Sequence, residues 1–161
     1  MLSRILVPLD GDPTTTEVLP SLRALVGGTG AEVHLLAVRP PLRELAQLEE
    51  RDLYLDELFR EEDAIWQDYL ARQGSQLAYD GVVVRREVRF GDPLVETLAA
   101  AERHAVHLIA LAARPQQAVQ RVLRPNLAQQ LLAQSAVPVL AVPAWPSSEH
   151  GAVFRYHSVA V

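Results

Sequence analysis

The sequence predicts an α/β domain in which helices cover both faces of an open, five-stranded parallel sheet. Short apolar runs rich in branched residues recur along the chain, and segments with helical signals, most of them ten residues or longer, separate them. Strands that alternate with such segments pair in parallel, because each connection crosses a face of the sheet. The expected strands cover residues 4–9, 32–38, 82–89, 107–112 and 137–142.

The same three residues, Gly-Asp-Pro, precede two of the expected helices. They occur as Gly11-Asp12-Pro13 and again as Gly91-Asp92-Pro93. Aspartate caps the free N–H groups of a first helical turn, and proline fits the first helical position because its missing N–H would be unbonded there. We therefore expect helices over about residues 14–26 and from Pro93 to about His104.

A long acidic segment after Pro40 and Pro41 is expected to be helical to about residue 73. Its large apolar residues lie three, four or seven apart and form one stripe: Leu45, Leu48, Leu55, Phe59, Trp66 and Tyr69. The acidic residues between them, including Glu61, Glu62 and Asp63, are expected to face water and not to act as catalytic carboxylates.

The remaining elements follow from the same patterns. The arginines of the third strand indicate that one end or edge of it is exposed. A last helix is expected to begin at Pro125 and to direct Leu127, Leu131 and Leu132 inward. Ligands of such sheets lie beyond the carboxyl ends of the strands, where the strand order reverses. Here those ends are at residues 9–10, 38–39 and 112–113.

The length of 161 residues and the 49% of hydrophobic residues indicate one domain with a substantial core. We expect this domain to cover residues 1–142 and a C-terminal extension to cover residues 143–161. Residues 152–161 of the extension could form a strand, and an apolar terminal strand is expected to pair. Pairing within the subunit and pairing across a dimer both remain open.

Composition excludes several classes of function. The chain has no cysteine, which excludes disulfides, thiolate metal sites and cysteine nucleophiles. All 15 basic residues are arginine, so no lysine can act as a general base or bind phosphate. A net charge of −5 without a basic cluster argues against nucleic-acid binding. No apolar run approaches the length of a membrane span and no signal peptide is expected, so we expect a cytoplasmic protein that does not bind membranes.

No constellation of catalytic or metal-binding residues can be assembled. His104 is expected to end a helix and His107 to begin a strand, and no histidine pair has a reliable ligand spacing with a third acidic ligand. A Ser–His–Asp set, a nucleophile elbow and a Walker loop are all missing from the sequence. We therefore expect no catalytic residue, no metal site and no enzymatic activity.

The chain resembles the universal stress protein family in four stretches and in their order: ILVPLDGD, GDP, HLIALA and AVPVLAV. The resemblance runs from about residue 4 to residue 142. It implies a Rossmann-like, five-stranded parallel α/β fold and a homodimer formed through the last strand. The interface residues that it implies are Val137, Val139, Leu140, Ala141 and Val142.

One branch of that family binds ATP through a loop G-x2-G-x9-G-[ST] after the fourth strand, and another branch does not. The resemblance places the four defining positions on Ala112, Pro115, Pro125 and Asn126. Proline has no N–H, and its φ is fixed at about −65°. Ala112 adds a β-carbon where a phosphate would approach the backbone. The loop is therefore not expected to hold ATP.

Part of the adenosine pocket matches the family, since Asp10 takes the place of the acidic residue that contacts adenosine. Arg114, Arg121 and Arg124 could also hold phosphates with their side chains. A purely structural interpretation also stays open, in which Asp10 only caps a turn and the arginines are solvated. If a nucleotide binds, the expected contacts are Pro8, Leu9, Asp10, Val38, Ala112, Arg114, Arg121, Pro125 and Asn126.

The function that these expectations favour is that of a non-enzymatic, homodimeric universal stress protein without a cofactor. Its regulatory or protective role under stress, exerted through a protein partner, is implied by the resemblance alone. One alternative is a sensor that binds ATP, AMP or another small anion in a modified pocket. A second alternative is an assembly module that binds another protein through the C-terminal strand and the long helix.

Overall fold

The computed structural model of the chain describes residues 3–39, 52–78, 81–113 and 126–144. Within them, five strands form one parallel sheet in the order β3-β2-β1-β4-β5. The predicted fold class is therefore confirmed, and each strand begins within two residues of the position expected from the sequence. The strands are β1 Arg4–Leu9, β2 Glu32–Arg39, β3 Val83–Phe90, β4 Leu108–Ala113 and β5 Val139–Pro143.

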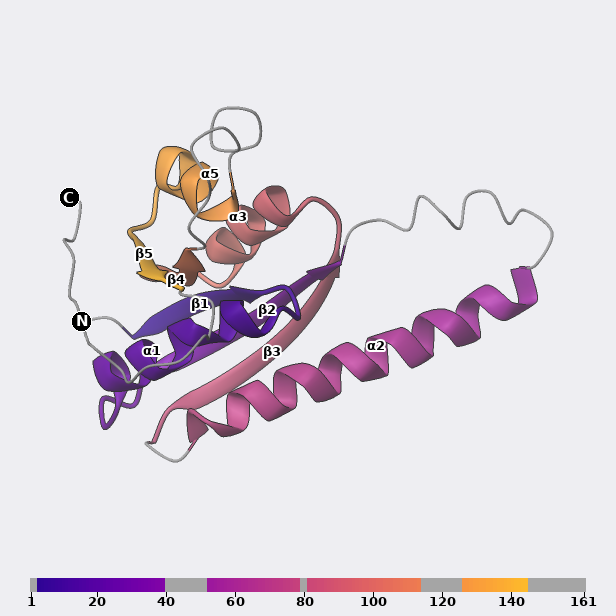
Figure 1. Cartoon of the computed structure of the whole chain (residues 1–161), viewed down its shortest axis with the longest axis horizontal. Coiled ribbons are helices and arrows are strands. Elements are labelled where there is room, and N and C mark those ends of the chain that lie inside the picture. Colours follow the sequence, from indigo (N-terminus) through magenta and orange to yellow (C-terminus); the bar gives the residue numbers. More distant parts are fainter. Residues whose placement is uncertain (1–2, 40–51, 79–80, 114–125, 145–161) are drawn as a thin grey trace.

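Helices cover both faces of the sheet, as Figure 1 shows. On one face lie the 3-10 helix η1 (Pro13–Glu17), α1 (Val18–Val26) and α2 (Asp52–Ser75). On the other face lie α3 (Pro93–Arg103) and α5 (Leu127–Gln134). β3 and β5 are the two edge strands, which agrees with the exposure expected of the arginines on β3.

Both predicted aspartate caps are present. Asp12 accepts a hydrogen bond from the backbone N–H of Thr14 at 2.8 Å, and Asp92 accepts one from the N–H of Leu94 at 2.9 Å. The first turn after Asp12 is a 3-10 helix, and the α-helical part of the expected helix begins at Val18. Its threonine hydroxyls bond to carbonyl oxygens three residues earlier, Thr15 to Asp12 and Thr16 to Pro13, and these bonds accompany the tighter turn.

The core has two layers, one on each face of the sheet. Alternate strand residues such as Ile5, Val7 and Val33 pack with the buried residues of α1 and α2. Leu6, Leu36 and their neighbours pack instead with α3 and α5, because successive side chains of a strand point to opposite faces. Within the part of the chain that the structure describes, no helix is both long and apolar enough to cross a bilayer.

Two sequence predictions about side-chain exposure are wrong. Leu132 is 53% exposed, while Leu131 and Ala128 provide the buried contacts of α5. Glu62 does not lie on a purely solvated face of α2, since it forms an ion pair with Arg39 at the end of β2. Arg39 is buried and its guanidinium also stacks on Phe90, 4.7 Å from the ring centroid. Glu61 is exposed as expected.

Candidate functional site

The carboxyl ends of β1, β2 and β4 meet at one edge of the sheet. β1 pairs in parallel with β2 on one side and with β4 on the other, so the strand order reverses between β1 and β4. Crevices at such a reversal are where open parallel sheets bind ligands. The edge that the sequence singled out is therefore assembled in the structure.

Asp10 follows β1 at this edge, and its side chain organises the turn into η1. Its Oδ1 atom accepts hydrogen bonds from the backbone N–H of Asp12 at 3.0 Å and from the hydroxyl of Thr15 at 3.0 Å. Asp10 itself is exposed. One carboxylate oxygen of Asp10 thus caps the turn, which is the role that the purely structural interpretation of Asp10 describes.

Two aromatic residues of α2 lie against the same turn. A β-carbon on Gly11 would meet Cη2 of Trp66 at 3.0 Å, so the indole ring lies close over the Gly11 backbone. Tyr69 packs edge-on against Trp66, with ring centroids 5.7 Å apart. Burial raises the pKa of Tyr69, and the carboxylates of Asp10 and Asp12 act in the same direction, so its hydroxyl remains protonated at neutral pH.

The apolar residues predicted for an adenine pocket are split between the two layers of the core. Leu9 is 2% exposed and belongs to the layer under α1 and α2. Val38 is 8% exposed and belongs to the layer under α3 and α5. Pro8 is buried and, as the neighbour of Leu9 in β1, faces the side of Val38. These side chains contribute mainly to the core.

The positions of the glycine-rich loop lie partly inside regular structure. Ala112 is within β4 and is paired with Val142 of β5. Asn126 caps α5, where its side chain accepts from the N–H of Gln129 at 2.9 Å and forms a capping box with that residue. Arg114, Arg121 and Pro125 lie outside the described residues, as do Pro115 and Arg124.

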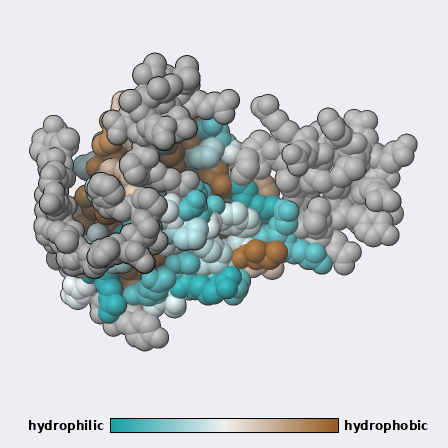
Figure 2. All heavy atoms as spheres, viewed as in Figure 1, coloured by the Kyte–Doolittle hydropathy of each residue, from teal (hydrophilic) through white to brown (hydrophobic). Residues whose placement is uncertain are grey.

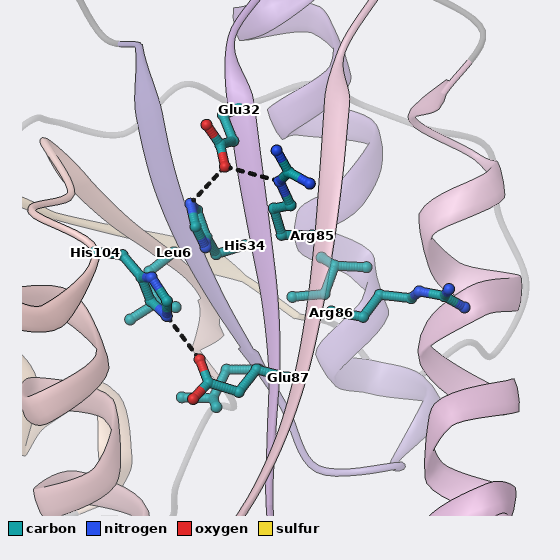
Figure 3. Close-up of a pocket in the computed structure, with 9 residues that line it drawn as sticks. Leu6, Glu32, His34, Arg85, Arg86, Glu87 and His104 are labelled. Carbon is teal, nitrogen blue, oxygen red and sulfur yellow. Dashed lines mark hydrogen bonds and ion pairs between the residues drawn. The ribbon is translucent and has the colours of Figure 1, made fainter.

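A second polar site, which the sequence analysis missed, lies on the face of the sheet beside α3. His34 of β2 stacks on His104 at the end of α3, with ring centroids 4.4 Å apart (Figure 3). Each imidazole faces its own carboxylate, Glu32 for His34 and Glu87 for His104. No group of three or more metal-ligating side chains occurs among the residues that the structure describes.

A known protein family matches almost the whole described part of the chain. The model of the universal stress protein family matches residues 1–143. The chain belongs to the universal stress protein family. The expected resemblance is thereby confirmed, whereas the finer placement in a branch without the ATP-binding loop stays a prediction. No curated protein matches the sequence closely enough to count as a relative.

Solved structures show the same fold. The hypothetical protein MJ0577 is similar with a TM-score of 0.74 and 24% identity, over 91% of this chain and 99% of that one. UspA from Lactobacillus plantarum gives a TM-score of 0.66 and 18% identity, over 88% and 97%. A universal stress protein in complex with cAMP gives a TM-score of 0.66 and 11% identity, over 89% of this chain and 98% of that one. At these identities the likeness concerns the fold alone.

Proposed function

We propose that this universal stress protein is a non-enzymatic homodimer that does not hold ATP in the manner of the glycine-rich loop. Its role is regulatory or protective under stress and is exerted through a protein partner. In this proposal residues 1–142 are the domain and residues 143–161 an extension of it.

The observation that carries the proposal is that Ala112 and Asn126 both have structural roles in the fold. Ala112 is paired within the sheet, and the side-chain oxygen of Asn126 accepts from the first turn of α5. Neither position therefore presents to a phosphate what a glycine or a hydroxyl would present. Pro115 and Pro125, at the other two positions, have no N–H to donate.

Calorimetry with ATP, AMP and cAMP on protein freed of any co-purified ligand tests this proposal. We expect no binding heat at millimolar nucleotide, and no nucleotide in denaturing mass spectrometry of the untreated protein. Micromolar binding of ATP would overturn the proposal. Arg114, Arg121 and Asn126 would then be the first residues to replace.

The alternative function is a sensor for an adenine nucleotide or another small anion, and a similar structure in complex with cAMP favours it. Asp10 is exposed at the carboxyl end of β1, where a ligand of this sheet would lie. Weak binding of AMP or cAMP that Asp10→Ala abolishes, in a protein that remains folded, would support the sensor. Binding that Asp10→Ala leaves unchanged would place the ligand elsewhere.

The proposed dimer uses the outer edge of β5. β5 ends the sheet in the described part of the chain, and the side chains of Val139, Leu140, Ala141 and Val142 are only partly buried. Figure 2 shows hydrophobic residues gathered around β5 and α5, whereas the face with α2 and β3 is mostly hydrophilic. A half-exposed apolar edge strand is a surface that proteins cover, here by a second copy.

Ala141→Arg is expected to convert the dimer into a folded monomer, because it places a charge in the middle of this strand. Light scattering after size exclusion measures the mass, and circular dichroism checks the fold. Val83→Arg is the matched control, since Val83 is 46% exposed on β3, the opposite edge. A wild-type monomer, or a dimer lost only with Val83→Arg, would contradict this interface. If only truncation after Ala144 dissociates the dimer, the extension and not β5 carries it.

A further inference from the structure

The hollow around the two histidines lies apart from the candidate ligand edge. It has a volume of about 370 Å³, and Leu6 and Leu36 are among the apolar residues that line it. Its polar groups come from three elements that are distant in the sequence, β2, β3 and the end of α3 (Figure 3). Nothing in the proposed function uses these groups.

His34 is the buried member of the pair, with 7% of its surface exposed. Its Nε2 atom lies 3.3 Å from Oε1 of Glu32, yet it has no hydrogen bond of proper geometry. Burial lowers the pKa of His34, the neighbouring His104 lowers it further, and Glu32 and Glu87 oppose both effects without cancelling them. His34 is therefore held in its neutral form at pH 7.

His104 connects the end of α3 to the edge strand. It follows the last residue of the helix, and its Nε2 atom lies 2.7 Å from Oε2 of Glu87 on β3. Arg103 donates to the other carboxylate oxygen of Glu87 at 2.7 Å, and Arg89 contacts the same oxygen. Burial alone would raise the pKa of Glu87, but the hydrogen bonds and positive charges of these neighbours outweigh it and lower the pKa from 4.5.

The charged side chains around the histidine pair carry a net positive charge. The carboxylates of Glu32 and Glu87 pair with Arg85 and Arg89 from β3 and with Arg103 from α3. Arg4 of β1 also lies close, since its Nε donates to the carbonyl oxygen of Ala105 beside His104. Arg86 also lines the hollow but points to the opposite side of the sheet, toward α2 (Figure 3). A proton added to His34 would therefore enlarge an existing positive excess, with its ring in stacking contact with His104.

We propose that the stacked pair His34–His104 is an acid-sensitive contact that releases the C-terminal end of α3 from β2 and β3 as the pH falls below neutrality. At neutral pH the neutral ring of His34 stacks on His104, and His104 and Arg103 bind Glu87. When His34 takes a proton, a buried cation would face the ring of His104 and the neighbouring arginines, with no hydrogen bond to Glu32 of proper geometry. Separation of α3 from β2 relieves this repulsion and hydrates both rings.

The sign of the pH dependence follows from the lowered pKa of His34. The open state takes the proton near the ordinary value of 6.5, while the closed state takes it only at lower pH. The contact is thus fully formed above about pH 6.5 and weakens as the pH falls below that value. The loss of the Glu87 ion pairs is a separate event, since that carboxylate titrates below 4.5.

Hydrogen exchange of the whole protein at pH 7.5 and 5.5, corrected for the intrinsic rate, tests the proposal. The reporters are the amides of His104, Ala105 and Val106, which bond to carbonyls in the last turns of α3. We expect their protection to fall severalfold at pH 5.5. Equal protection at both pH values in the wild-type protein would overturn the proposal.

Three variants separate this contact from other titrations. His34→Phe keeps a ring in the stack but cannot take a proton, so it should abolish the pH dependence at the end of α3. If His34→Phe does not fold, His104→Gln, which can still donate to Glu87, should weaken the pH dependence, because it removes the stacked imidazole but leaves the burial of His34. His107→Gln is the matched control, because His107 is an exposed imidazole that contacts Ser3 and Arg4 instead. An acid response that survives in folded His34→Phe, that is unchanged in His104→Gln, or that disappears only with His107→Gln contradicts the assignment.

Discussion

Replacing Glu62 by alanine is expected to lower the free energy of unfolding by about 3 kcal/mol. Arg39 is 5% exposed, and Glu62 is the carboxylate that faces its guanidinium. Without Glu62, the buried cation loses this carboxylate and keeps its contact with the face of the Phe90 ring, and its Nη1 atom already has no hydrogen-bond partner within the described structure. Removing one partner of a buried ion pair costs about 3–5 kcal/mol, and the lower end applies because a third of the Glu62 side chain is exposed.

Urea denaturation measures this loss, and the same helix provides its control. Asp68 and Arg72 form an ion pair at 3.0 Å, but both side chains are about two-thirds exposed. Asp68→Ala should therefore cost no more than about 0.5 kcal/mol. The double variant Arg39→Met/Glu62→Leu should recover stability over Glu62→Ala, because no unpaired charge is left. Equal costs for Glu62→Ala and Asp68→Ala would show that Arg39 is hydrated in solution.

The fold was predictable because its signals are local or periodic. The three central strands β1, β2 and β4 are largely buried and appear as mainly apolar runs, and the Asp-Pro caps work through atoms two or three residues away. Glu62 was assigned wrongly because its partner lies on another element. A helical pattern shows which face of α2 is polar, but not that a strand end with a buried arginine lies against that face.

The two polar sites differ in the same way. The hydrogen bonds of Asp10 reach Asp12 and Thr15, which are near in the sequence, so its place in a turn could be anticipated. The stack of His34 on His104 joins a strand to the end of a distant helix. The sequence did contain one signal for this contact. Because side chains alternate along β2, His34 lies on the same face as Leu36 and Val38, and a polar residue buried there requires a hydrogen-bond partner.

Gly11→Ala is expected to lower the free energy of unfolding by about 2 kcal/mol, through two additive causes. Gly11 has a φ of +84°, a conformation that costs a residue with a β-carbon about 1 kcal/mol or more. The added carbon would also lie 3.0 Å from the Trp66 ring, which must shift within a packed surface. Chemical denaturation measures the total.

Gly28→Ala separates the two causes, because Gly28 has a φ of +72° but, its chain neighbours aside, no atom of the described residues lies within 4 Å of an added β-carbon. It should cost only the backbone part, about 1 kcal/mol. Trp66→Leu in the Gly11→Ala background should remove the steric part, which a double-mutant cycle resolves. Equal costs for the two glycine variants would mean that the indole moves freely. A clear difference would mean that α2 fixes the turn carrying Asp10, and that any ligand at this edge meets a carboxylate whose position the long helix determines.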